Sequence, residues 1–191
     1  MLTFYLYNPD DDNDDFLPES AVTIREYLDN TPLWKPQLEN TILTFSGLSM
    51  VSNEDINNFG ILPHLISQLE EVKKRLSKNQ FALLKTSNYN ESLFFIFKPK
   101  EDKTYFSLLG LLPSPYNTYY PLTESPFYFK DVDQQKELYD FVESATENQW
   151  SDNLIGNLQN IKNIEYNTSE LILSIEEQTR LGNELLEFLR T

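Results

Sequence analysis

Three aromatic and aliphatic runs separated by short polar turns constrain the fold of this 191-residue chain more than any other feature. The runs cover residues 81–86, 93–98 and 105–112. Connections this short join antiparallel neighbours, whereas a parallel crossover needs a dozen or more residues. The pattern therefore predicts a three-stranded antiparallel meander over about residues 80–112. Because Leu93–Phe97 is apolar on both faces, we expect this strand to be central and covered on both sides.

Helical spacing and capping residues predict helices both before and after the meander in the sequence. One apolar stripe runs through residues 62–77, with charged residues on the opposite face. Ser174 and Glu177 form a capping-box pattern that predicts the start of the last helix, and Ser20 is suited to cap a short helix before Pro32. The other expected elements are strands at 2–7, 41–46 and 170–173 and helices at 52–60, 131–148 and 151–161.

These elements indicate the α+β class, with an antiparallel sheet, its central meander at about 80–112, packed with about five to six helices. A single α+β domain over residues 1–191 is the simplest organisation. A subdivision near residue 128 stays open, because strands dominate 1–128 and helices dominate 129–191.

The composition excludes several classes of functional site. The chain has no cysteine, which rules out disulfides, Cys-ligated zinc, iron–sulfur clusters and thiol nucleophiles. His64 is the single histidine, and the five glycines form no phosphate-binding loop. We therefore expect no cofactor, no bound metal and no enzymatic activity.

The sequence also gives an expectation about location. No apolar run approaches the roughly 20 residues of a membrane span. The first residues lack the basic stretch and the small-residue cleavage site of a signal peptide. These observations predict a cytoplasmic protein without membrane contact.

Charge is the second strong signal. The chain has 30 acidic and 15 basic residues, a net charge of −15. Residues 1–30 carry −7, residues 31–130 carry +1 and residues 131–191 carry −9. This distribution opposes nucleic-acid binding, which depends on neutralising phosphates, and favours a basic protein partner.

The one basic cluster of the sequence does not change that expectation. Lys73, Lys74, Arg75 and Lys78 share their helix with Glu70 and Glu71. We expect a solvated surface with ion pairs at i,i+4 spacing rather than a nucleic-acid site.

The densest acidic segment contains five aspartates, and its spacing does not fit a calcium loop. With Asp10, Asp12 and Asp14 as the first ligands, Asp15 replaces the turn glycine and Ala21 replaces the bidentate glutamate. The pattern favours a solvated acidic loop. Magnesium held by one or two carboxylates stays an alternative.

A proline-rich segment, residues 113–126, is the second candidate surface. It contains four prolines and three tyrosines, which exclude a regular helix. Tyrosines on a stiffened loop give a large contact area at a small entropy cost. They are either exposed for recognition or folded back onto the sheet.

In its general character, a small, acidic, cysteine-free α+β chain without a catalytic motif, the protein resembles bacterial immunity proteins that neutralise a toxin. The resemblance implies an antitoxin-type binding module that occludes a basic or nucleic-acid-targeting toxin. The predicted partner-binding residues are Asp10, Asp11, Asp12, Asp14, Asp15, Tyr116, Tyr119 and Tyr120. The alternatives are a hydrolase that holds Mg²⁺ or Ca²⁺ with the aspartates, and a scaffold protein that assembles with copies of itself. The oligomeric state is open.

Overall fold

The computed structural model describes residues 2–8, 10, 20–36, 38, 41–45, 59–60, 62–88, 91–109 and 164–191. The elements in chain order are β1 (Leu2–Leu6), β2 (Val22–Thr23), α1 (Ile24–Asn30), β3 (Thr41–Phe45), β4 (Phe59–Gly60), α2 (Leu62–Leu76), β5 (Ala82–Asn88), β6 (Glu91–Lys100), β7 (Lys103–Leu109), β8 (Ile164–Asn167) and α5 (Thr168–Phe188).

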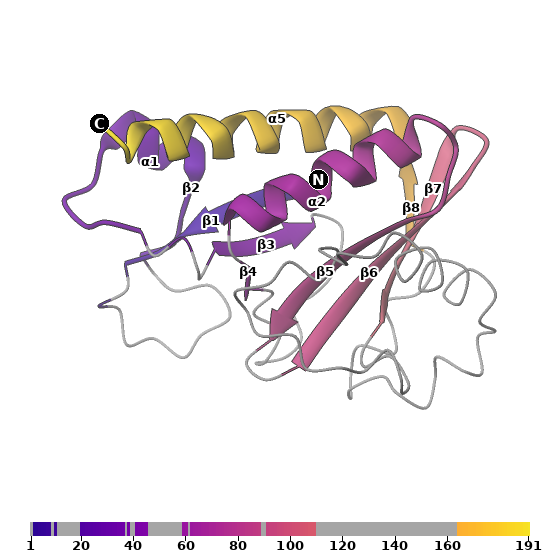
Figure 1. The fold of residues 1–191 in the computed structure, drawn as a ribbon, viewed down its shortest axis with the longest axis horizontal. Helices are drawn as coiled ribbons and strands as arrows, with labels where there is room; N and C mark the ends of the chain where they lie inside the picture. Colours follow the sequence, from indigo (N-terminus) through magenta and orange to yellow (C-terminus); the bar gives the residue numbers. More distant parts are fainter. Residues whose placement is uncertain are drawn as a thin grey trace.

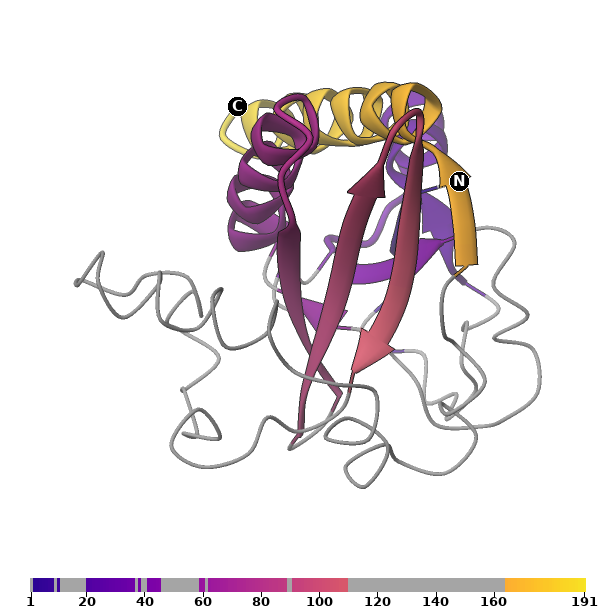
Figure 2. The same cartoon turned by 90° about the vertical axis from the view of Figure 1, so that its right-hand side faces the viewer.

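The strands form one antiparallel sheet in the order β2-β1-β3-β4-β5-β6-β7-β8. All three described helices lie on one face of it (Figure 2). Helix α5 runs along the molecule from β8 to α1 and packs beside α2 (Figure 1). The predicted α+β class with an antiparallel sheet is therefore confirmed.

The meander is confirmed as β5, β6 and β7. A two-residue turn joins the last two strands, where Lys100 pairs with Lys103 and Glu101 has a positive φ of 59°. Strand β6 continues through Pro99, which the sequence placed in a turn. The proline is tolerated because β5 begins at Ala82, opposite Phe97, so no strand lies opposite Pro99 on that side.

Strand β6 is buried on both faces at residues 95–97, as the sequence predicts. Phe95 and Phe97 belong to the core beneath the helices, where both rings contact Phe106. Ile96 points to the opposite face and pairs with Leu83, and both side chains are buried as well.

The expectation of five to six helices is not met in the described part of the chain, which has three. The predicted helix at 62–77 is confirmed as α2. The helices expected at 52–60, 131–148 and 151–161 fall almost entirely outside the described residues, and Phe59–Gly60 is strand β4.

One predicted helix start and one predicted strand are wrong. Thr23, not Ser20, caps α1, because pairing with β1 keeps Val22 and Thr23 extended and Glu26 then completes a capping box with Thr23. Residues 170–173, predicted as a strand, belong to α5, because Leu171 and Ile175 lie one turn apart on its buried face.

Helix α5 is capped by Asn167, and Ser174 has a different role from the predicted cap. The Ser174 hydroxyl accepts a hydrogen bond from the Leu2 N–H at 3.0 Å, and Gln178 Oε1 accepts one from the Phe4 N–H at 3.0 Å. Both N–H groups lie on the side of β1 that β2 is too short to cover. Two helix side chains thus close this part of the sheet edge, which protects it from pairing with another strand.

Candidate protein-docking surface

The acidic segment leaves and re-enters the fold at one point. The Asn8 N–H donates to the Ser20 hydroxyl at 3.0 Å, directly after the β1–β2 pair of Leu6 and Val22. Asp10 is exposed, and its N–H donates to Asn8 Oδ1 at 3.1 Å. The two ends of the connection between β1 and β2 are therefore joined by the Asn8–Ser20 hydrogen bond, which we call its closed base, and Asp10 beside it faces solvent.

The other predicted contact residues cannot be placed on this surface. Asp11, Asp12, Asp14 and Asp15, and likewise Tyr116, Tyr119 and Tyr120, lie outside the described residues. The roles assigned to the two segments, steering and anchoring, stay predictions.

Helix α1 follows β2 directly, and its start is fixed by Glu26. The Thr23 N–H and hydroxyl both donate to the Glu26 carboxylate at 2.8 Å. The backbone hydrogen bond first, and the hydroxyl second, hold the pKa of Glu26 below its usual value. Arg25 on the same helix forms a 2.7 Å ion pair with Glu177, which ties α1 to α5.

The segment after α1 displays a side chain that the sequence analysis missed. Leu33 has a relative exposure of 106%, the largest among the exposed apolar residues of the described part. Thr31 before it adopts the left-handed conformation, with φ 44° and ψ 67°, while its N–H bonds to the Tyr27 carbonyl. A positive φ is strained for a β-branched residue and is found mainly where the surrounding structure imposes it.

Tyr27 fixes the backbone of this segment through its contacts with Trp34. Its hydroxyl donates to the Trp34 carbonyl at 2.9 Å, and the two rings meet edge to face at 5.1 Å. Burial raises the pKa of Tyr27, so the phenol keeps its proton, and this hydrogen bond, throughout the neutral range. Leu33 is therefore exposed from a fixed backbone.

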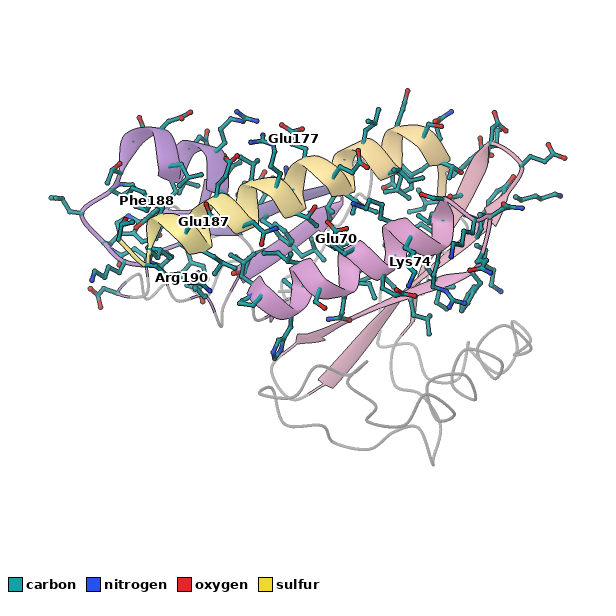
Figure 3. The ribbon with its side chains drawn as sticks, turned by 45° about the horizontal axis from the view of Figure 1, so that its top comes forward. Glu70, Lys74, Glu177, Glu187, Phe188 and Arg190 are labelled. Carbon is teal, nitrogen blue, oxygen red and sulfur yellow. The ribbon has the colours of Figure 1, made fainter. Side chains whose placement is uncertain are left out.

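The C-terminal part of α5 completes this end of the molecule. Phe188 is 40% exposed, and Figure 3 places it with Glu187 and Arg190 beside α1. The closed base, α1, residues 31–36 and the last turns of α5 all lie at the same end (Figure 1). We call this region the α1 end.

The opposite end carries the basic cluster. Lys73 pairs with Glu70 at 2.6 Å and Lys74 with Glu71 at 3.3 Å (Figure 3 labels Glu70 and Lys74), which confirms an ion-paired, solvated surface. The spacing is i,i+3 instead of the predicted i,i+4. Arg75 is half-buried, and its Nε donates to the Phe81 carbonyl at 2.6 Å.

The turn between β6 and β7 lies at this same end. Lys103 pairs with Glu165, which raises the pKa of the lysine, first through the hydrogen bond and then through the opposite charge.

Within the described residues, no three acidic or histidine side chains come together as a metal site. The carboxylate-based hydrolase therefore gains no support from this part of the chain.

Comparison with known proteins gives no relative for this chain. Neither a family model, nor a curated protein, nor a solved structure matches it. In the described part, no helix has both the length and the apolar character needed to cross a membrane.

Proposed function

We propose that the protein is a binding module that captures and occludes a basic protein, as an immunity protein occludes a bacterial toxin in the cytoplasm. The toxin class that fits best acts on nucleic acid, because such proteins present the positive surface that a polyanion requires. In this proposal the chain catalyses no reaction.

The observation that carries the proposal is the closed base of the acidic segment at the α1 end. The Asn8–Ser20 hydrogen bond holds both ends of the aspartate-rich connection together at the end of the molecule that also carries residues 31–36 and the last turns of α5, where Leu33 and Phe188 are exposed (Figure 1). A dense group of carboxylates beside exposed apolar surface is suited to a positively charged protein surface.

Charge and apolar contact have separate tasks in this arrangement. The carboxylates raise the rate of encounter with a basic partner, and this effect weakens as salt increases. Burial of apolar side chains then sets how long the complex lasts. Asp10 to Asp15 act in the first step, and the tyrosines of residues 113–126 are proposed to add to the second.

The test replaces Asp10, Asp11, Asp12, Asp14 and Asp15 by Asn, which changes the net charge from −15 to −10. The partner is the protein that the wild type captures from its native host in stoichiometric amount. At low salt, we expect the variant to associate about tenfold more slowly, with the difference lost at about 0.5 M salt.

A matched control makes the same change of charge outside the α1 end. Its five substitutions are Glu70→Gln, Glu71→Gln, Glu101→Gln, Asp102→Asn and Glu165→Gln. These side chains are solvent-accessible and belong to α2, the β6–β7 turn and β8, outside the α1 end, so the association rate should change much less (Figures 1 and 3). Equal association rates for the two variants would remove the acidic segment from the mechanism.

A further inference from the structure

We propose that Leu33 is the apolar anchor of the docking surface and inserts into an apolar pocket, bordered by Lys and Arg, on a partner protein. The inference rests on the proposed function and names the contact that holds the complex together. It adds a contact residue that the sequence analysis did not identify.

The first argument is the way in which Leu33 is exposed. Single exposed apolar residues are common on protein surfaces, and exposure alone needs no explanation. Leu173, on α5, is such a residue, with 63% exposure. Leu33 instead lies outside any helix or strand, on a segment whose backbone brings its side chain fully into solvent.

The second argument is that the segment is already rigid without a partner. Pro32 and Pro36 restrict the backbone on both sides of Leu33. The Tyr27 hydroxyl bonds to the Trp34 carbonyl, and the strained Thr31 fixes the direction in which the chain leaves α1. An anchor held in its bound conformation loses little entropy on binding, which is how rigid loops gain affinity.

The third argument concerns the chemistry of the occupant. The end of the molecule that carries Leu33 also holds the Asn8–Ser20 hydrogen bond, and the exposed carboxylates described there are Asp10, Glu26, Asp29 and Glu187 (Figures 1 and 3). A protein steered by these carboxylates brings a basic surface to the end where the leucine is exposed. A second copy of the chain brings a net charge of −15 of its own and is repelled. Charge complementarity therefore selects a basic partner over self-association.

The test uses a displayed library of random peptides as a defined probe. Peptides are selected on the wild-type protein, and their dissociation constants are then measured on Leu33→Asp and on the control Leu173→Asp. We expect the selected peptides to combine Lys or Arg with a large apolar residue. Their affinity should fall at least tenfold on Leu33→Asp and stay within about twofold on Leu173→Asp.

A second variant tests the rigidity of the segment without changing the leucine. Tyr27→Phe removes the hydroxyl that donates to Trp34 while the ring contact stays, so affinity should fall by a smaller factor, about threefold. Because Leu33 contributes nothing to the core, Leu33→Asp should unfold at the same denaturant concentration as the wild type.

Three results would overturn the inference. They are equal peptide affinity for Leu33→Asp and wild type, selected peptides that lack basic residues, and a dimer of the chain that dissociates on Leu33→Asp. Failure of the proposed function has a different signature, since it appears as a partner association rate that ignores the five aspartates. The two experiments therefore separate an incorrect anchor from an incorrect function.

Discussion

The layer formed by α2 and α5 differs from the α1 end in what its apolar side chains and glycine contact. In the helical layer these residues pack against other parts of the chain. A Cβ on Gly182 would lie 2.7 Å from Ile66 Cδ1, which shows how closely the two helices approach. At the α1 end, Leu33 is fully exposed while its neighbours Tyr27 and Trp34 hold the backbone.

This difference separates stability from recognition. A buried side chain that touches its neighbours on all sides contributes to folding, and its loss is measured in free energy of unfolding. An exposed side chain on a fixed backbone contributes little to folding, so its energy is available for binding. The two regions should therefore respond to substitution in different assays.

The largest effect is expected in the core that the helical layer covers, to which strand β7 contributes Phe106. Phe106 is fully buried and its ring contacts those of Phe95, Phe97 and Tyr166. Phe106→Ala leaves a cavity and should lower the free energy of unfolding by about 3–5 kcal/mol, measured by urea denaturation.

Phe188→Ala is the matched control for this substitution. It removes the same ring from a site at the α1 end that is 40% exposed, and it should cost less than about 1 kcal/mol. Similar losses of stability for the two variants would erase the distinction between the regions.

A smaller effect with the opposite sign is expected at Thr31. Asn adopts the left-handed conformation more readily than a β-branched residue, and the N–H bond to the Tyr27 carbonyl is retained. Thr31→Asn should stabilise the protein by up to about 1 kcal/mol. A loss of stability would show that the threonine is not strained.

The smallest effect is a local response to alkaline pH. Burial raises the pKa of Tyr27 in the folded protein, whereas the same phenol in the unfolded chain ionises near its ordinary value of about 10. Its contribution is therefore complete below about pH 10 and is lost as the pH rises through the folded-state pKa.

Trp34 reports this ionisation, because its carbonyl accepts the Tyr27 hydroxyl and its ring contacts the tyrosine. In a Trp150→Phe background, its fluorescence should change with a midpoint above pH 10. The change should disappear when Tyr27→Phe is added. A transition that persists without the tyrosine hydroxyl would assign the signal to another group.

The sequence predicts those parts of the fold that local spacing determines. Helix α2 and the meander follow from apolar periodicity and short turns, which depend on neighbours in the chain. The start of α1 does not, because pairing of Val22 and Thr23 with β1 overrides the capping tendency of Ser20. The role of Ser174 at the edge of β1 depends on a contact across 172 positions of the chain.

The candidate surface was predicted in part for the same reason. A run of aspartates is visible in the sequence, and Asp10 is indeed exposed. Leu33 was recognisable only as part of a segment interrupted by prolines. Its exposure follows from the hydrogen bond and ring contact between Tyr27 and Trp34, which composition does not reveal.

The central claim is that carboxylates bring a basic partner to the α1 end and that Leu33 then holds it. The most direct measurement is the association and dissociation rate of the captured partner on the wild type, the five-aspartate variant and Leu33→Asp. The account predicts slower association for the aspartate variant at low salt and faster dissociation for Leu33→Asp. Rates that are unchanged in both variants would contradict it.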